Sequence, residues 1–335
     1  MINIAVIGVG YWGPNLVRNF SNTEGASVVT VCDTSEDRLQ RIARSYPGIK
    51  LTTDFTSVLQ DDAVHAVAIA TPVRTHYPLA KAALEAGKHV LLEKPMTESS
   101  CEAKELMELS QKVHKVLLVD HTFLYMGAIR KLKALIDAGD LGTINYYDSM
   151  RVNLGIFQND VNVAYDLATH DISILYYLLP DRPIGVSATG MSHIAGQPEN
   201  VAFMTLFYPN SMIAHINVNW LSPVKIRQTL ICGSRRMVVF DDLHASEKIK
   251  IYDSGITVRN VEDINKAKVE YRMGDILIPT YPRTEALTVE AAHFVACIRG
   301  DEQPLSGAKL GYEIVKLLEA AEKSLKANGN YVEVQ

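Results

Sequence analysis

The sequence predicts an α/β protein in which a doubly wound parallel sheet is followed by an α+β domain with a large, mainly antiparallel sheet. Two observations predict this order. Strand and helix signals alternate over the first third of the chain, as in βαβ units. Strand signals then follow one another with few helices between them, which is typical of antiparallel sheets.

A glycine-rich turn lies between the first expected strand and the first expected helix. The apolar run 2–7 has the composition of a buried parallel strand, and Gly8, Gly10 and Gly13 follow it in the spacing G-x-G-x-x-G. Pro14 falls in the first helical turn, where its missing N–H costs nothing. A tight turn that leads into a helix N-terminus is suited to a pyrophosphate.

An acidic residue follows at the place where a dinucleotide-binding domain needs one. The next strand, 27–32, stops at Asp33, twenty residues beyond Gly13. A carboxylate there binds both ribose hydroxyls of the adenosine, so the sequence predicts a Rossmann domain that binds NAD. Asp33 favours NAD because it repels the 2′-phosphate of NADP, although Arg38 lies close enough in the sequence to offset part of this effect.

The remaining elements complete the two predicted domains. The Rossmann domain is expected over residues 1–122, with further strands at 63–70, 89–93 and 115–123 and helices at 35–46, 77–86 and 101–113. The substrate-binding and oligomerisation domain is expected over residues 123–335. It contains helices at 128–138 and 165–179, six strands between 144 and 242, and two C-terminal helices at 287–300 and 311–329. One sheet face is expected to be open and to form a homodimer or homotetramer.

Composition excludes several classes of protein. The net charge of −5 and the pI near 6.1 argue against a nucleic-acid partner. No apolar stretch is long enough to span a membrane, and the N-terminus does not have the pattern of a signal peptide. The four scattered cysteines have no zinc-binding or disulfide pattern, so a reduced cytoplasm is the expected location.

Candidate reactive residues fall in two places. Lys94 follows an apolar strand at the edge where ligands of parallel sheets bind, although a lysine there can also simply reach solvent. Asp166 and His170 are four residues apart on a predicted helix, so the carboxylate can orient an imidazole for acid–base chemistry. A helix-surface ion pair is the competing interpretation. Asp171 is expected only to meet solvent or to cap the helix, and no metal site is expected because no further ligands have suitable spacing.

The chain resembles the glucose–fructose oxidoreductase, inositol dehydrogenase and rhizopine-catabolism (Gfo/Idh/MocA) family over nearly its whole length. The resemblance is carried by GVGYWG at 8–13, by ATPVRTHYPLAKAALEAGKHVLLEKP at 70–95, by DLATHDI at 166–172 and by the segment 283–307. It implies that Lys94, Asp166 and His170 are catalytic and that a cis peptide precedes Pro95. The residues expected to bind the coenzyme are Gly8, Gly10, Tyr11, Trp12, Gly13, Asp33, Thr71, Pro72, His76, Glu93, Lys94 and His121.

The expected activity is NAD-dependent oxidation of a ring hydroxyl without a metal. The GYWGPN variant resembles members that oxidise nucleotide sugars at C3, which suggests UDP-N-acetylglucosamine as the substrate and polysaccharide biosynthesis as the context. The substrate would contact Lys94, Asp166 and His170, and its diphosphate would need donors such as Arg151, Lys225, Arg227 and Arg283, with Tyr281 placed to stack on uracil. The alternatives are a keto-sugar reductase, an inositol or free-sugar dehydrogenase, and a dinucleotide-sensing regulator without catalysis.

Overall fold

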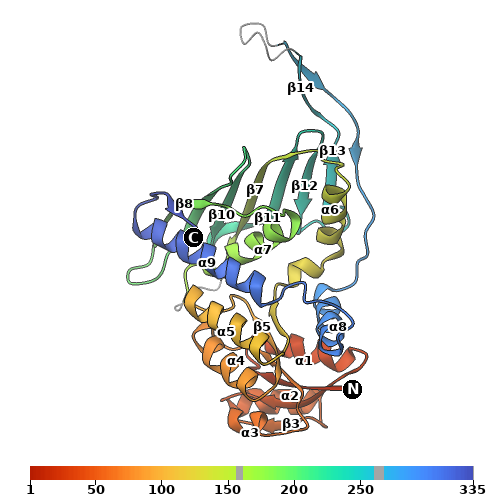
Figure 1. The fold of residues 1–335 in the computed structure, drawn as a ribbon, viewed down its shortest axis with the longest axis vertical. Helices are drawn as coiled ribbons and strands as arrows, with labels where there is room; N and C mark the ends of the chain where they lie inside the picture. Colours follow the sequence, from red (N-terminus) through yellow and green to blue (C-terminus); the bar gives the residue numbers. More distant parts are fainter. Residues whose placement is uncertain (156–160, 260–267, 335) are drawn as a thin grey trace. The chain divides into compact units, whose positions relative to one another are not determined.

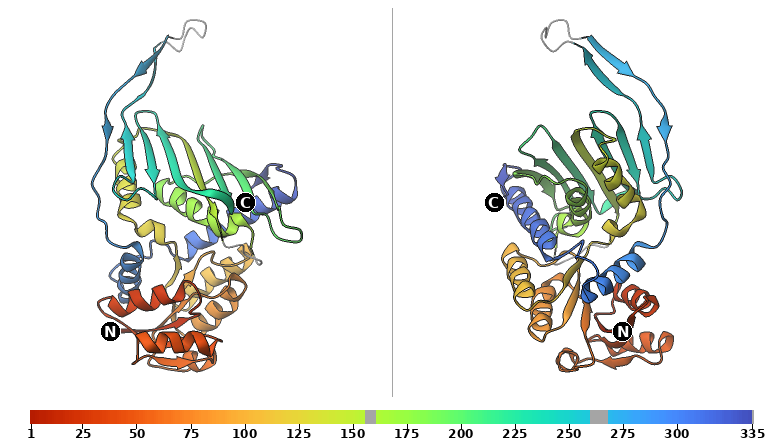
Figure 2. Two further views of the ribbon diagram at one scale, coloured as in Figure 1. Left: turned by 180° about the vertical axis from the view of Figure 1, so that it is seen from behind. Right: turned by 45° about the vertical axis from the view of Figure 1, so that its right-hand side comes forward.

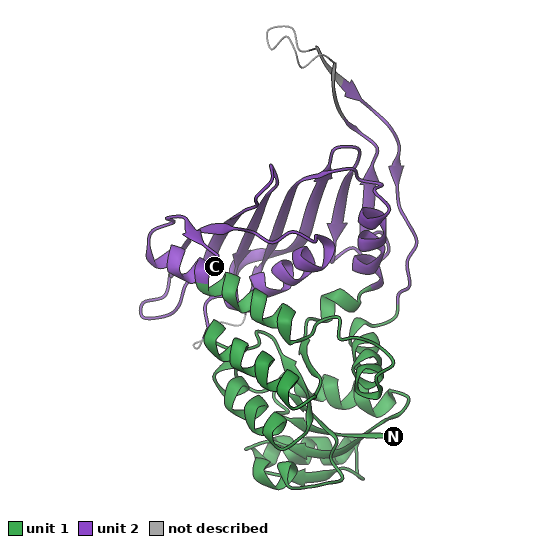
Figure 3. Ribbon diagram, viewed as in Figure 1, with its two compact units in different colours: residues 1–126, 284–319 green, residues 127–283, 320–335 purple. Residues whose placement is uncertain are grey.

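The computed structural model describes residues 1–155, 161–259 and 268–334. The chain folds into two compact units, which Figure 3 shows in different colours. Unit 1 comprises Met1–Met126 and Thr284–Glu319, and unit 2 comprises Gly127–Arg283 and Ala320–Gln335. Each unit is described by itself below.

Unit 1 is built on a six-stranded sheet in which every neighbouring pair is parallel, in the order β3-β2-β1-β4-β5-β6. Its strands are β1 Ile2–Ile7, β2 Ala26–Cys32, β3 Lys50–Thr52, β4 Ala66–Ile69, β5 His89–Glu93 and β6 Leu117–Asp120. Its helices before residue 126 are α1 Gly13–Asn22, α2 Glu36–Ser45, α3 Phe55–Leu59, α4 His76–Glu85 and α5 Ser100–Lys112, with short helical turns η1 Val73–Thr75 and η2 Thr122–Tyr125. The predicted Rossmann domain is confirmed.

Two apolar cores cover the two faces of this sheet. Alternate residues of β1 point to opposite faces: Ile4 and Val6 join the core formed with α1 and α2, while Ala5 and Ile7 join the core formed with α4 and α5. The helix α8, Ala286–Arg299, also belongs to the first core, where Phe294 packs edge-on against Phe20 with the ring centroids 6.0 Å apart.

The segment 284–319 therefore belongs to unit 1, whereas the sequence interpretation placed it in a second domain spanning 123–335. The helix α9, Ala308–Lys326, begins in unit 1, where Val315 enters the second core, and its last residues belong to unit 2. Helical periodicity predicted both C-terminal helices but carries no information about which sheet they cover.

Unit 2 contains a nine-stranded sheet in the order β16-β13-β12-β11-β7-β10-β9-β8-β17. The strands are β7 Ile144–Leu154, β8 Gly185–Met191, β9 Val201–Phe207, β10 Ile213–Asn219, β11 Leu221–Gly233, β12 Met237–Asp241, β13 Ile249–Tyr252, β16 Ile276–Leu277 and β17 Val332–Glu333. Among the pairs in this sheet only β10 and β7 run parallel within the described residues. The predicted α+β unit with a mainly antiparallel sheet is confirmed.

Helices cover one face of the nine-stranded sheet. The views in Figures 1 and 2 show α6, Gly127–Asp137, and α7, Thr169–Leu178, on the same side of it. The opposite face carries exposed apolar side chains, among them Met150, Phe203 and Ile213. A separate two-stranded hairpin, β14 Gly255–Arg259 and β15 Lys268–Arg272, extends away from the large sheet (Figure 1) and was not predicted from the sequence.

Candidate active site

The glycine-rich turn is held by close backbone packing. Gly8 adopts φ of +86°, and a Cβ atom there would lie 2.6 Å from the carbonyl oxygen of Ala70. A Cβ atom at Gly13 would collide with the carbonyl oxygen of Gly8. These two glycines therefore allow β1, the exit of β4 and the start of α1 to pack in contact. Pro14 lies in the first turn of α1, as predicted.

Gly10 has a different environment. A Cβ atom at this position would meet only one group within 4 Å, the Nη1 atom of Arg38 at 3.8 Å. Protein packing therefore does not require a glycine here, and the missing side chain instead leaves room in front of the N-terminus of α1. Backbone N–H groups at such a terminus bind phosphate oxygens, so the turn fits the pyrophosphate of a dinucleotide.

Asp33 lies at the end of β2 and is fixed by backbone donors. Its Oδ2 accepts a hydrogen bond of 2.7 Å from the Val9 N–H, and its Oδ1 accepts one of 2.8 Å from the Ser35 N–H. The Nη1 atom of Arg38 lies 3.6 Å from Oδ2. This carboxylate thus links the glycine-rich turn to the start of α2, at the position predicted for the acid that binds the ribose.

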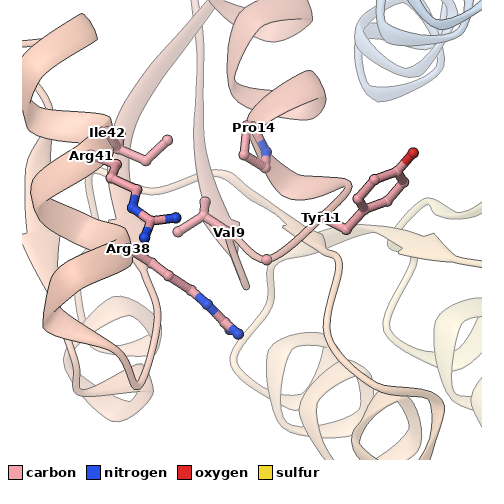
Figure 4. A pocket seen from close by; sticks show the side chains of 7 residues that line it. Val9, Tyr11, Pro14, Arg38, Arg41 and Ile42 are labelled. Carbon is pink, nitrogen blue, oxygen red and sulfur yellow. The ribbon is translucent and has the colours of Figure 1, made fainter. Parts of the chain in front are cut away.

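A pocket of about 310 Å³ is lined in part by Arg38, the residue whose guanidinium lies near this carboxylate. Figure 4 shows that α2 contributes Arg38, Arg41 and Ile42 to one side, while the turn contributes Val9 and Tyr11, with Pro14 above them. Tyr11 is exposed. The pocket is therefore lined by the turn and by the helix after Asp33, where a Rossmann domain binds the adenosine half of its coenzyme.

The exits of β4 and β5 are tied together by a buried histidine. The two ring nitrogens of His76 lie 2.9 Å from the carbonyl oxygens of Thr71 and Pro95. Burial lowers the pKa of His76, so it is neutral at neutral pH. A neutral imidazole has one N–H, so it donates to one of these carbonyl oxygens and only packs against the other. His76 therefore supports the loop that carries Thr71 and Pro72.

Lys94 follows β5 directly and precedes a cis peptide bond to Pro95, as the resemblance implied. Its backbone N–H donates to Oε2 of Glu93 over 3.2 Å. The positive charge of Lys94 lowers the pKa values of His76, Glu93 and His121, so its ammonium group is within electrostatic range of three residues predicted to line the coenzyme.

His121 is a predicted coenzyme residue with a buried ring that makes no hydrogen bond within the described residues. Its side chain is buried, and neither ring nitrogen has a partner there. Burial lowers its pKa to about 4, so the imidazole is neutral. A buried imidazole without a protein partner, next to the end of β6, fits a position that contacts a bound group.

A cluster of acids lies beneath the glycine-rich turn. Trp12 donates its indole Nε1–H to Oδ2 of Asp120 over 3.0 Å, and Thr122 donates its hydroxyl to the other oxygen. Glu93 and Glu290 both interact with Asp120. Burial, reinforced by the charge of Asp120, raises the pKa of each glutamate well above its usual value. Both glutamates therefore keep their protons to a higher pH than exposed carboxyl groups do.

Glu290 was not predicted from the sequence as a site residue, because it lies on α8, in a segment assigned to the other domain. It is fully buried, and neither of its carboxyl oxygens receives a hydrogen bond of good geometry within the described residues. The sequence did contain a signal for this burial, because Glu290 lies on the apolar side of an amphipathic helix, at helical spacing from Leu287 and Phe294. A carboxyl on such a face must lose its contact with water.

In unit 2, Asp166 lies in a π-helical turn, Ala164–Ala168, and His170 lies in the first turn of α7. The indole Nε1–H of Trp220 donates to Oδ2 of Asp166 over 3.0 Å. Asn162 fixes the start of this turn, because its side-chain oxygen accepts hydrogen bonds of 3.1 Å from the N–H groups of Ala164 and Tyr165. Single π turns are frequent at functional sites. In this one, Asp166 is held by Trp220, a residue outside the turn.

Arg151 and Asp171 form an ion pair that corrects two expectations. The Nε atom of Arg151 donates to Oδ2 of Asp171 over 2.7 Å and its Nη2 donates to Oδ1 over 3.2 Å, with each side chain 3% exposed. Asp171 therefore does not simply meet solvent or cap its helix. Arg151 is buried and engaged by this carboxylate, so it is not placed to receive a substrate diphosphate.

The other candidate substrate residues lie elsewhere in unit 2. Arg227 pairs with Asp242 over 3.3 Å, and the Nη2 atom of exposed Arg283 donates to the carbonyl oxygen of Ser246 over 3.3 Å. Lys225 is exposed on β11, and Tyr281 is partly buried just before Arg283. Lys94 belongs to unit 1, whereas Asp166 and His170 belong to unit 2.

Comparison with known proteins identifies both units. The model for the oxidoreductase family with an NAD-binding Rossmann fold matches residues 2–121, and the model for the GFO/IDH/MocA C-terminal domain matches residues 129–239. The chain belongs to the Gfo/Idh/MocA family. This Gfo/Idh/MocA protein is therefore an oxidoreductase with an NAD-binding domain, and its coenzyme is NAD.

Several relatives are dehydrogenases of sugars or cyclitols. The chain is 28% identical to UDP-N-acetylglucosamine 3-dehydrogenase of Acidithiobacillus ferrooxidans, over 81% of this chain and 84% of the relative. It is 30% identical to scyllo-inositol 2-dehydrogenase (NAD⁺) of Bacillus subtilis, over 56% of this chain and 57% of the relative. Levoglucosan dehydrogenase, solved with NADH and levoglucosan, superimposes with a TM-score of 0.82 at 20% identity and covers 99% of both chains, which shows a shared fold.

Within the described residues, no group of three or more His, Cys, Asp or Glu side chains is arranged to hold a metal ion. Among the helices that the structure describes, none has the length and apolar character needed to span a membrane.

The buried acids make stability depend on pH. The folded chain keeps a proton on Glu290 that the unfolded chain releases above the usual carboxyl pKa, so the free energy of unfolding falls as pH rises through the raised pKa. One such proton gives a slope of up to about 1.4 kcal/mol per pH unit. Gln is neutral at every pH and has nearly the shape of the protonated acid, so we expect Glu290→Gln to flatten the loss of stability as pH rises above the usual carboxyl pKa, measured by urea unfolding.

The matched control is Glu85→Gln, which removes an exposed carboxylate from α4. It should leave the pH profile of the free energy of unfolding as in the wild type. Identical profiles for wild type and Glu290→Gln would show that Glu290 ionises at the usual carboxyl pKa in the folded protein, which would contradict the prediction.

Proposed function

We propose that this chain is an NAD-dependent dehydrogenase that oxidises the C3 hydroxyl of a nucleotide sugar, UDP-N-acetylglucosamine, to a 3-keto sugar. The observation that carries the reaction type is the Asp166–His170 pair at the π turn, four residues apart and braced by Trp220. The substrate is supported by the 28% identical relative that bears this activity in its name and that matches most of the chain.

In this proposal His170 is the general base. It takes the proton from the substrate hydroxyl, because an imidazole accepts a proton readily near neutral pH. Asp166 acts as a positioning residue that orients the imidazole and stabilises the positive charge that forms on it. NAD, when bound, accepts the hydride from the same carbon.

Lys94 has a separate part in the proposal. Its ammonium group donates a hydrogen bond to the reacting oxygen and stabilises the alkoxide charge that develops there. Burial and the charge of Asp120 raise the pKa values of Glu93 and Glu290, which favours their neutral forms, and a neutral carboxyl competes less for the ammonium group than an anion would. For the substrate diphosphate we propose exposed Arg283, with Tyr281 against the uracil, because the guanidinium of Arg151 is occupied.

Replacing the base should remove turnover without removing coenzyme binding. We expect His170→Ala to lower kcat by about 10²- to 10⁴-fold, the usual effect of losing a positioned acid–base group. NADH affinity, measured by fluorescence titration, should stay near the wild-type value. The matched control is His114→Asn, which removes an exposed histidine just after α5 and keeps a residue that tolerates the positive φ of this position. Near-wild-type turnover in His170→Ala, or in Lys94→Ala, would refute the assignment.

The substrate is tested by following NADH formation with UDP-N-acetylglucosamine, in the presence of glutamate and an aminotransferase that consumes the 3-keto product. Removing the product matters because the oxidation is unfavourable by itself. A substrate deuterated at C3 should yield deuterated NADH, which identifies the oxidised carbon. myo-Inositol and free glucose are the comparison substrates. Activity on these alone would overturn the nucleotide-sugar assignment and leave the dehydrogenase assignment intact.

We also propose that the open face of the nine-stranded sheet binds a second copy of the chain. Register places Met150, Asn217 and Phe203 in one row across β7, β10 and β9, and two of these side chains are exposed and apolar. Ile213 adds a third exposed apolar side chain to the same face. Apolar side chains gathered on one surface are typical of an interface.

Light scattering should therefore report a homodimer or homotetramer. Charges placed in this face are costly to bury without partners, so Phe203→Asp combined with Ile213→Asp should shift the mass toward the monomer. Leu243→Asp, at an exposed position outside the sheet, is the control and should leave the mass unchanged. A monomeric wild type, or a double variant of unchanged mass, would refute this interface.

A further inference from the structure

Three carboxyl groups, here called the carboxyl cluster, meet at the ends of two neighbouring strands of unit 1. Glu93 ends β5, Asp120 ends β6, and Glu290 reaches them from α8. Oε1 of Glu93 and both carboxyl oxygens of Glu290 are buried and accept no hydrogen bond within the described residues. Carboxyl groups that share a site are not all ionised together, so the cluster retains a proton to a higher pH than exposed carboxyl groups do.

The carboxyl cluster lies on the side of the sheet where we expect the nicotinamide half of the coenzyme. In the strand order β3-β2-β1-β4-β5-β6 the direction of winding reverses between β1 and β4, and a dinucleotide binds across this point at the carboxyl ends of the strands. Asp33, at the end of β2, marks the adenosine half. The other half is therefore expected at the exits of β4, β5 and β6, which all belong to unit 1 (Figure 3).

A buried imidazole beside the carboxyl cluster points to a ligand at this place. His121 is 1% exposed, and neither of its ring nitrogens has a hydrogen-bond partner within the described residues. The charges of Asp120 and Lys94 both act on its pKa, so the ring is within electrostatic range of the cluster and of the lysine. A buried polar group without a partner is costly. A bound group that supplies the missing hydrogen bond is therefore expected next to these acids.

Titratable groups outside the cluster also lie near Glu290. Tyr125 in η2 interacts with it electrostatically, and burial raises the pKa of this tyrosine well above its usual value, so its hydroxyl stays neutral. Further along α8, the imidazole of His293 is engaged by Glu302 and by the N–H of Leu305. An imidazole can titrate near neutral pH, so a proton released by the cluster has to be identified with variants of its own carboxyl groups.

We propose that Glu93, Asp120 and Glu290 together distinguish the oxidised from the reduced coenzyme, because NAD⁺ binding releases a proton from them and NADH binding does not. The nicotinamide ring carries a positive charge in NAD⁺ and none in NADH. A positive charge beside the carboxyl cluster favours its ionised form, and the proton passes to the solvent. Once a hydride has neutralised the ring, the cluster takes up a proton from the solvent again. The inference depends on coenzyme binding and not on the proposed sugar substrate.

The pH dependence of binding follows from the form of the cluster that each coenzyme prefers. NAD⁺ binds the deprotonated form more tightly, whereas NADH binds both forms alike. The Kd of NAD⁺ relative to that of NADH should therefore fall as pH rises, by up to about 10-fold per pH unit. The fall should be confined to the range between the pKa of the cluster with NAD⁺ bound, which is the lower one, and its pKa in the free protein.

The test measures proton release with a pH-indicator dye in weakly buffered solution, as coenzyme is added between pH 6 and 9 in the absence of sugar. At the pH of the largest effect, the wild type should release up to about one proton more per NAD⁺ bound than per NADH bound. ADP-ribose, which lacks only the nicotinamide ring, reports protons released by other groups and should match NADH. The two Kd values are measured at each pH by NADH fluorescence and by competition of NAD⁺ with NADH.

Variants identify the source of the proton. Glu290→Gln keeps the shape of the side chain and should reduce the extra proton release at least 2-fold. Glu93→Gln combined with Glu290→Gln leaves Asp120 without an acidic neighbour in the cluster and should abolish the release and the pH dependence of the Kd ratio. Glu85→Gln, at an exposed position of α4, is the control and should keep the wild-type release.

Equal proton release by NAD⁺, NADH and ADP-ribose at every pH would overturn the proposal, and this comparison needs only the wild type. An extra proton that persists in the double variant, or that disappears in Glu85→Gln, would also overturn it. Failure of the sugar assays alone would leave it standing.

Discussion

The carboxylate of Asp120 is the group on which the coenzyme-binding side of unit 1 depends. It lies at the end of β6 and accepts a hydrogen bond from the indole of Trp12, in the glycine-rich turn. Glu93 at the end of β5 and Glu290 on α8 both meet it. Four segments that are distant in the sequence therefore converge on one buried charge, and its hydrogen bonds fix the positions of the strand ends that carry the coenzyme site.

The contribution of α8 explains why the chain is not two consecutive domains. Unit 1 needs a helix over one face of its sheet, and the chain supplies it only after the long first segment of unit 2, Gly127–Arg283. The same helix brings Leu287 and Phe294 to the apolar core and Glu290 to the acids. Packing of the sheet and hydrogen bonding of the coenzyme site thus depend on one late segment.

Local signals in the sequence were sufficient for much of this structure. The glycine spacing, the acid at the end of β2 and the alternating strand and helix patterns predicted the Rossmann sheet, because each reflects a backbone or burial requirement of its own neighbourhood. The turn at Asp166 was predicted as a helix, and its π-helical form depends on Asn162 and Trp220, which short-range periodicity does not describe.

Long-range partners were not predictable in the same way. Helical periodicity gave α8 an apolar side but not the sheet against which it packs, so the burial of Glu290 was missed. An arginine on a strand and an aspartate on a helix each read as polar surface groups by themselves. Only the fold brings Arg151 and Asp171 together. Both side chains are buried in their ion pair, so neither is accessible to a substrate.

The Arg151–Asp171 pair also constrains how this chain can change over time. Loss of either partner leaves a buried charge without compensation, which is far more costly than replacing both by apolar residues that fill the same volume. Single substitutions at these positions are therefore expected to be eliminated by selection, whereas paired ones survive. Positions 151 and 171 should therefore covary among related sequences, so that β7 and α7 evolve together at this contact.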